Sequence, residues 1–283
     1  MTRIALVTDS TAYLPPALVE RYQITVVPLY VLFGNESLRD NVDITPLEFY
    51  DRLRMVKDTL PTTSQPSAGD FHAVYQRLKA DHDAIISLHI SGPLSGTVAS
   101  AQQARALLPD FPIHVIDTLS TSMGLGYCVL AAARAIEAGG SVVEALAAAQ
   151  KIIPQVRIHF AVDTLRYLHM GGRIGGASVL LGTALGIKPI LEVRAGRIEA
   201  AGKVRSMKRA QEWLVDDVVK QLGPKARVRA AVLSAANPVG AEQVIMMLRE
   251  HLDCVELHIA EVSPVLGTHV GPGTVGVAYH AEP

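Results

Sequence analysis

The chain has 283 residues, of which 49% are hydrophobic and 19% are charged, and its formal net charge is −1. This composition is typical of a folded globular protein and argues against disorder. The small net charge gives no electrostatic reason to expect nucleic acid or an anionic membrane surface as a partner. Only 5% of the residues are aromatic, so aliphatic side chains must build the core. At this length, two domains are the natural expectation.

No segment of the sequence predicts secretion or stable membrane insertion. The N-terminal residues enter an apolar strand at once, without the apolar stretch and small-residue cleavage site of a signal peptide. No apolar run approaches the roughly 18 residues that a transmembrane helix needs. The cysteines, Cys128 and Cys254, lie far apart, and we expect both to be buried, reduced thiols. We therefore expect a soluble, cytoplasmic protein.

Short apolar runs alternate with helical patterns in the first half of the chain. The predicted strands cover Ile4–Thr8, Ile24–Phe33, Ala84–Ile90 and Ile113–Asp117. A helix over Pro46–Met55 has Thr45 as its expected N-cap. Alternating strands and helices indicate βαβ units around a parallel sheet, in which the loops after the strands line the ligand crevice. The polar loops expected to converge there carry Asp9, Thr63, Ser95 and Ser120.

The second half of the chain mixes a hairpin with helices. Strands over Ile187–Val193 and Arg197–Ala201 flank a short turn that contains Gly196. Further strands are predicted over 157–162, 227–233 and 255–262, and helices over 208–222 and 238–252. This pattern predicts a second α/β layer of different construction. We place the boundary near Gln155, which gives domains of residues 1–155 and 156–283.

Two hydroxyl-rich segments are candidate anion sites. Four hydroxyls, from Thr62, Thr63, Ser64 and Ser67, precede a predicted helix, and Ser95-Gly96-Thr97 lies at a strand-to-helix junction. Such hydroxyls can simply cap the helices that follow. At the second segment the helix N-terminus also favours an anion, and Gly96 would let that anion approach the backbone. Together the two segments favour a carboxylate or a phosphate.

Two basic side chains could complete such a site. His269 lies in a loop rich in glycine and proline, where core packing does not readily explain a histidine. It could donate to an anion or act as an acid or base, and a solvent-exposed loop histidine is the alternative. Arg173 follows two glycines and could pair with a carboxylate or phosphate, with an ordinary surface arginine as the alternative.

Enzyme motifs occur only as fragments. Ser95 lies in Leu-Ser-Gly-Thr, which is not the Gly-x-Ser-x-Gly nucleophile elbow. A glycine pair at 124 and 126 begins like a dinucleotide fingerprint, but Val129 replaces the third glycine. Asp9 lacks the second aspartate of a phosphatase motif, because Thr11 stands two residues on. The sequence contains no phosphate-binding loop and no Cys/His cluster with zinc spacing, so we expect neither a cofactor nor a metal.

Motifs spread over nearly the whole chain resemble those of the DegV family. In order they are VTDST at 7–11, TTSQPS at 62–67, LSGT at 94–97, VIDT at 115–118, GGRIG at 171–175, LGIKPIL at 185–191 and HVGPGTVG at 269–276. The resemblance implies a parallel-sheet α/β/α domain followed by an α/β domain with a mixed sheet. It also implies a long-chain fatty acid, such as palmitate, in a buried tunnel. The acid would be held for lipid transport or for presentation to the catalytic subunit of a fatty acid kinase.

The resemblance also implies roles for individual residues. Thr63 and Ser95 match hydroxyls that bind the carboxylate, and Gly96 matches the backbone donor beside them. His269 matches a histidine near the head group, and Arg173 matches the arginine of the GGR turn, which is a candidate contact for the head group or for a partner. The family often reads S-S-G-L-S-G-T where this chain has S-G-P-L-S-G-T, which changes the loop before Ser95.

The resulting expectation is a lipid-binding protein of fatty acid metabolism that has no catalytic residue. The alternative is a hydrolase or transferase that uses Ser95 and His269 on an acyl or phosphorylated small molecule.

Overall fold

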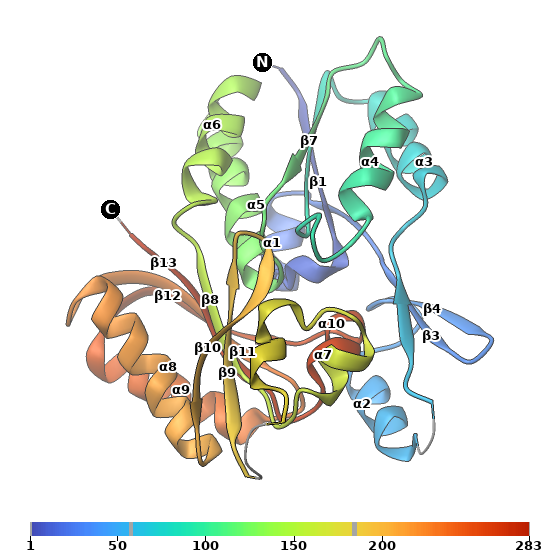
Figure 1. Ribbon diagram of the computed structural model, residues 1–283. Coiled ribbons are helices and arrows are strands. Elements are labelled where there is room, and N and C mark those ends of the chain that lie inside the picture. The colour runs from blue at the N-terminus through green and yellow to red at the C-terminus, as the bar shows by residue number, and fades with distance from the viewer. Residues whose placement is uncertain (1, 57–58, 183–185, 283) are drawn as a thin grey trace.

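The structure is a computed structural model that describes residues 2–56, 59–182 and 186–282. Within this part of the chain the strands form a four-stranded, a six-stranded and a three-stranded sheet. The four-stranded sheet belongs to the first half of the chain and the six-stranded sheet to the second half (Figure 1). This arrangement confirms the predicted fold class, a parallel-sheet α/β unit followed by a mixed-sheet α/β unit.

The four-stranded sheet is entirely parallel. Its strands, in spatial order, are β2 (Thr25–Val27), β1 (Ile4–Asp9), β6 (Ala84–His89) and β7 (Ile113–Asp117). Both faces are covered, as the nearly continuous apolar sequence of the strands requires. Because side chains alternate along a strand, Ala5 and Val7 of β1 pack into one buried cluster and Leu6 into another.

Helices cover both faces of this sheet (Figure 1). The helices of the first half, apart from one beside the small sheet, are η1 (Ser10–Ala12), α1 (Pro16–Arg21), α3 (Ala68–Lys79), α4 (Thr97–Ala106), α5 (Ser122–Glu137) and α6 (Val142–Ile152). Helices α3 and α4 contribute Phe71, Tyr75 and Ala101 to the cluster that contains Val7. Helix α5 lies against the opposite face and is buried over most of its length.

The six-stranded sheet is mixed, since β11 and β12 are parallel and the other neighbours are antiparallel. Its strands, in spatial order, are β10 (Arg197–Val204), β9 (Lys188–Arg194), β8 (Arg157–Ala161), β13 (Val275–Ala281), β11 (Arg227–Ser234) and β12 (Asp253–Glu261). The hairpin between β9 and β10 is confirmed, with Ala195 and Gly196 at positive φ of 49° and 76°. This two-residue turn matches the twist of the strands that it joins.

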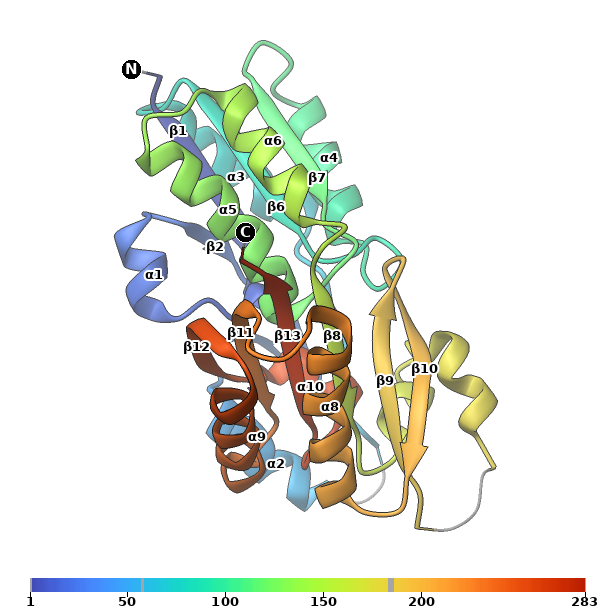
Figure 2. The same cartoon turned by 90° about the vertical axis from the view of Figure 1, so that its left-hand side faces the viewer.

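Helices α8 and α9 cover one face of this sheet, and α5 of the first half packs against the other face (Figure 2). The helices of the second half are α7 (Arg166–Met170), η2 (Gly175–Leu180), α8 (Met207–Leu222), α9 (Pro238–His251) and α10 (Pro264–Val270). Helix α5 therefore contributes to the cores of both halves. Leu185, which begins one of the quoted motifs, lies outside the described residues.

The small antiparallel sheet corrects two predictions. Its strands are β4 (Glu36–Arg39), β3 (Tyr30–Phe33) and β5 (Thr62–Ser64), and α2 (Pro46–Met55) lies nearby. The single strand predicted over Ile24–Phe33 is wrong, because Pro28 lacks an N–H donor and the chain leaves the parallel sheet there. The segment 62–64, expected only as hydroxyl-bearing residues before a helix, pairs with β3 as a strand. Helix α2 is confirmed, and Thr45 and Glu48 form its capping box.

Buried contacts join the two halves of the chain. One continuous apolar cluster contains Leu6 and Ile86 of the first half together with Ile158 and Leu233 of the second. The hydroxyl of Ser91 donates to the Gly196 carbonyl at 2.7 Å, so the tip of the β9–β10 hairpin meets the loop after β6. A division into domains of residues 1–155 and 156–283 stays a prediction.

Both cysteines are free, and Cys128 is buried whereas Cys254 is only partly buried. Burial raises the pKa of the Cys128 thiol to about 12. None of the helices within residues 2–56, 59–182 and 186–282 combines the length and the apolar character needed to cross a membrane.

We predict that Gly196→Ala destabilises the protein, because a Cβ at this positive φ would also press on Ser91 Oγ. Gly139 is the matched control, since it has a φ of +84° and no heavy atom within 4 Å of an added Cβ. Backbone strain alone should lower the free energy of unfolding of Gly139→Ala by about 1–2 kcal/mol. Urea unfolding should show a larger loss for Gly196→Ala. Equal losses would show that the contact between the halves contributes nothing.

Candidate ligand-binding site

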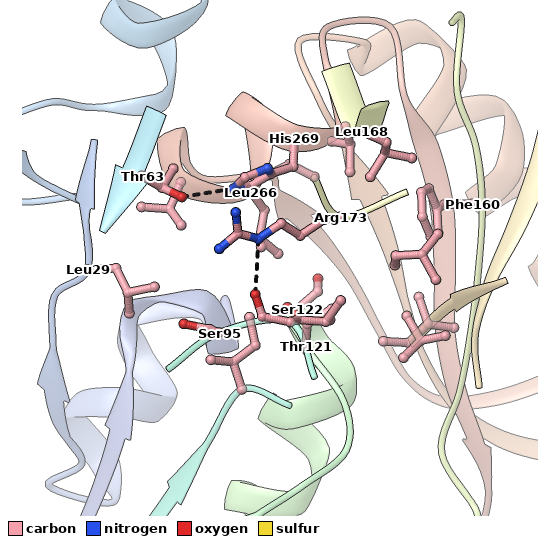
Figure 3. A pocket seen from close by; sticks show the side chains of 18 of the residues that line it. Leu29, Thr63, Ser95, Thr121, Ser122, Phe160, Leu168, Arg173, Leu266 and His269 are labelled. Carbon is pink, nitrogen blue, oxygen red and sulfur yellow. Dashed lines mark hydrogen bonds between the residues drawn. The ribbon is translucent and has the colours of Figure 1, made fainter. Parts of the chain in front are cut away.

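A mostly apolar cavity lies where the carboxyl edge of the parallel sheet meets the six-stranded sheet and α10. Its volume, counted together with the open space at its mouth, is about 850 Å³. Its lining is mostly apolar and comes from both halves of the chain (Figure 3).

Aliphatic side chains and one phenylalanine form most of this wall. The apolar side chains that line the cavity are Leu29, Ile90, Leu94, Ile158, Phe160, Leu168, Val193, Ile198, Leu233, Val262, Val265, Leu266 and Val270. Apolar surface of this kind favours a ligand whose own surface is apolar, because burial removes both surfaces from water.

Thr63 and His269 form the polar pair at one side of the cavity. Thr63 Oγ1 lies 2.9 Å from His269 Nε2, although 206 positions separate them in the chain (Figure 3). Thr63 is presented by β5, and His269 lies in the last turn of α10. The prediction of a loop around His269 is wrong. A seven-residue helix opens at Pro264, and only the residues from Gly271 onward leave it.

His269 is a buried histidine, with 8% of its surface exposed. Burial, with a smaller contribution from the positive charge of Arg173, lowers the pKa of His269 from 6.5 to about 4. The imidazole is therefore neutral at physiological pH. Its Nδ1 has no hydrogen-bond partner within the described part of the chain. Gly171 leaves room for this ring, because an added Cβ there would lie against His269 Nδ1.

Ser95 and Gly96 lie at the start of α4, as the sequence predicts. The Ser95 hydroxyl is 2.9 Å from Thr97 Oγ1 and accepts a long hydrogen bond of 3.4 Å from the Thr97 N–H. Local capping therefore describes part of its role. Gly96 is the N-cap residue of α4, and a Cβ there would meet the Gln65 side chain at 3.0 Å. Gln65, which lies between β5 and α3, is thus packed against the Ser95 loop.

The loop before Ser95 keeps a regular shape despite its Gly92-Pro93 sequence. The Ser95 N–H donates to the Ser91 carbonyl at 3.0 Å, which closes a helical turn. Asp117, at the end of β7, accepts a hydrogen bond of 3.1 Å from the Gly92 N–H. The loop is therefore held between the end of β6, which it follows, and the end of β7.

Arg173 joins the second half of the chain to this loop. Its Nε donates to the Leu94 carbonyl at 3.2 Å, and its Nη1 donates to the Gly171 carbonyl at 2.8 Å. The residue is exposed and lines the cavity. Its guanidinium is thus held near both Ser95 and His269, where it could attract an anion.

The geometry gives little support to the hydrolase alternative. Ser95 and His269 line the same cavity, but each is hydrogen-bonded to a threonine and not to the other. Asp9 is fully buried and accepts hydrogen bonds from Thr11 and from the Ile90 N–H. It caps η1, in agreement with the capping interpretation, and does not line this cavity.

A chain of buried polar groups that the sequence did not predict runs through the parallel sheet. Ser87 Oγ lies 2.7 Å from His89 Nε2, and His89 Nδ1 lies 3.0 Å from Asp9. The Tyr75 hydroxyl donates to Ser87 at 2.8 Å. The order resembles a Ser-His-Asp triad, but Ser87, His89 and Asp9 are all 0% exposed, so no substrate can reach the hydroxyl.

Sequence reasoning also missed three polar groups in the cavity wall, those of Tyr13, Thr121 and Ser122. The hydroxyls of Thr121 and Ser122 are buried and have no hydrogen-bond partner within the described part of the chain. The only sequence signal was the hydroxyl-rich stretch before α5, which resembles an ordinary helix start. No group of three or more metal-binding side chains occurs among the described residues.

Comparison with known protein families matches residues 3–282 to the DegV family, whose description is "Uncharacterised protein, DegV family". The chain belongs to the DegV family. It is 42% identical to a DegV domain-containing protein of Streptomyces coelicolor over 97% of both chains. It is 33% identical to the protein DegV of Bacillus subtilis over 98% of both chains.

Solved structures of DegV-family proteins share this fold. A fatty-acid-binding DegV protein from Thermus thermophilus superposes with a TM-score of 0.93 at 39% identity, over 99% of this chain and 100% of that one. The DegV protein of Bacillus subtilis, described as a fatty acid binding protein, gives a TM-score of 0.89 at 32% identity and full coverage of both chains.

We predict a pH-dependent contribution of His269 to the stability of this DegV-family protein. Its folded-state pKa of about 4 lies below the ordinary value of 6.5, so acid protonates the unfolded chain first. The stabilisation is complete above the ordinary value and is lost as the pH falls toward 4, by on the order of 3 kcal/mol in all.

Urea unfolding between pH 7 and 4 checks this prediction, with His269→Gln as the comparison. Other histidines titrate in both proteins, so the difference between the two profiles isolates His269. The wild type should lose more stability than the variant over this range. Parallel profiles would show that His269 is not held neutral by burial.

Proposed function

We propose that this protein binds one long-chain fatty acid in the cavity, with its carboxylate held by Thr63, Ser95 and the Gly96 N–H. The observation that carries the proposal is a mostly apolar cavity with a cluster of hydrogen-bonding groups in its wall. His269 lies beside the head group as a neutral donor or acceptor, and Arg173 contributes positive charge. The fatty-acid-binding members of the family support this assignment, since their fold covers the whole chain.

The apolar tail supplies most of the binding free energy in this proposal. Burial contributes about 0.8 kcal/mol per methylene, so roughly fifteen methylenes contribute on the order of 12 kcal/mol before ordering costs of several kcal/mol. A carboxylate loses its hydration on entering and must recover hydrogen bonds. Two hydroxyls, a backbone N–H and the N-terminus of α4 supply them, which fixes the direction of the chain in the cavity.

The proposal extends to the biological role. The acid is of palmitate length, and the protein carries it in the cytoplasm for lipid transport or presents it to the catalytic subunit of a fatty acid kinase. Arg173 supports presentation, because it is exposed and lies beside the head-group residues. Binding needs no nucleophile or base, so the protein acts as a lipid carrier and not as an enzyme.

We predict that the double variant Thr63→Val with Ser95→Ala binds palmitate at least on the order of 100-fold more weakly than the wild type, since two hydrogen bonds to a charged group are lost. Calorimetric titration with palmitate and with hexadecanol separates the contribution of the carboxylate to binding from that of the alkyl chain, because only palmitate carries a carboxylate. The wild type should prefer the acid strongly, whereas the double variant should bind the two ligands with similar affinity.

Ser64→Ala is the matched control. Ser64 neighbours Thr63 on β5, but its hydroxyl already donates to the Gln65 carbonyl, so the variant should keep the preference for the acid. Urea unfolding confirms that each variant is folded. If the double variant still prefers palmitate to hexadecanol as the wild type does, the carboxylate is bound elsewhere.

A further inference from the structure

A second polar site interrupts the apolar wall of the cavity at the start of α5. Thr121 and Ser122 both line the cavity, and their hydroxyl oxygens are buried without a hydrogen-bond partner in the part of the chain that the structure describes. Thr121 is 7% exposed and Ser122 is 2% exposed. In the view of Figure 3 the two residues lie between Ser95 and Phe160.

The backbone presents these hydroxyls to the cavity instead of using them within the helix. Thr121 is the N-cap residue of the 16-residue helix α5, yet its side chain makes no cap hydrogen bond. Ser122 has a φ of 50°, in the left-handed region that residues other than glycine rarely adopt. Strained positions of this kind cluster at ligand sites. The N-terminus of α5 adds a partial positive charge that favours an oxygen acceptor.

We propose that this site recognises an oxygen atom carried on the acyl chain, so that the protein selects hydroxy or oxo fatty acids over unsubstituted ones. The inference rests on the proposed function, because it places the carboxylate at Thr63 and Ser95. A plain methylene chain would fill the cavity and leave both hydroxyls buried and unsatisfied, which is unfavourable. A hydroxyl or keto oxygen at the matching carbon satisfies them.

The neighbours of the site argue for a neutral oxygen on the chain and against a second carboxylate site. Ile158, Phe160 and Leu233 line the same cavity in the second half of the chain. Arg173, the exposed cation of the cavity wall, is already hydrogen-bonded to the Leu94 and Gly171 carbonyls. A neutral hydroxyl needs no compensating charge, and a serine and a threonine hydroxyl can each donate to it or accept from it.

Competition binding with positional isomers tests the inference. Palmitate competes with hydroxy- and oxohexadecanoic acids whose oxygen stands at successive carbons, on the wild type and on Thr121→Val with Ser122→Ala. At least one isomer should bind the wild type ten-fold or more tightly than palmitate. The double variant should lose this preference while its palmitate affinity stays equal or rises.

Two further variants serve as controls. Thr121→Ser keeps the hydroxyl and should keep the preference, whereas Ser64→Ala removes a cavity-wall hydroxyl that already has a partner and should not change it. If the double variant does not fold, either single substitution, Thr121→Val or Ser122→Ala, should reduce the preference by a smaller factor.

Each remaining outcome is decisive. If the wild type binds palmitate but prefers no oxygenated isomer, the inference fails and the proposed function stands. If the double variant loses affinity for palmitate as severely as it loses affinity for the isomers, the carboxylate itself lies at α5, and the inference is overturned. If the wild type binds no acid of any kind, the proposed function fails and the inference fails with it.

Discussion

The unfavourable free energy of placing polar groups in an apolar cavity governs how this site is built. A carboxylate can enter only where hydrogen-bonding groups are already positioned. Here the Thr63–His269 pair joins a strand of the small sheet to a helix of the second half. The site therefore exists only when both halves are folded and packed together, and α10 must be held firmly for the pair to form.

Buried hydrogen bonds from the first half hold α10. Asp40 accepts from Ser10 at 2.7 Å, from Ser263 at 2.8 Å and from the Val265 N–H at 3.3 Å, which ties the start of α10 to η1. Burial raises the pKa of Asp40 to about 6. Gly267 lets the helix lie directly on α2, since a Cβ there would meet the Tyr50 hydroxyl at 2.7 Å. The head-group site thus depends on residues that do not line the cavity.

Local sequence patterns account for the elements that local forces decide. The apolar strands β1 and β6 and the capped helix α2 were predictable, because their burial and capping patterns are complete within a few residues. The predicted strand over Ile24–Phe33 is wrong, because the β-branched residues on both sides of Pro28 form one continuous pattern although the chain changes sheets there. The loop predicted around His269 is wrong, because the glycines that follow this residue are typical of a loop although it lies in the last turn of a short helix. The buried, unpaired hydroxyls of Thr121 and Ser122 depend on tertiary contacts, so no sequence pattern reveals them.

The central claim is that a fatty acid occupies the cavity with its carboxylate at Thr63 and Ser95. Native mass spectrometry of the freshly purified protein, followed by extraction into organic solvent, tests it most directly. The account predicts a single species heavier than the bare chain by the mass of one long-chain acid, and that acid in the extract. A protein that shows only the bare mass, and that stays bare after incubation with long-chain acids, would contradict it.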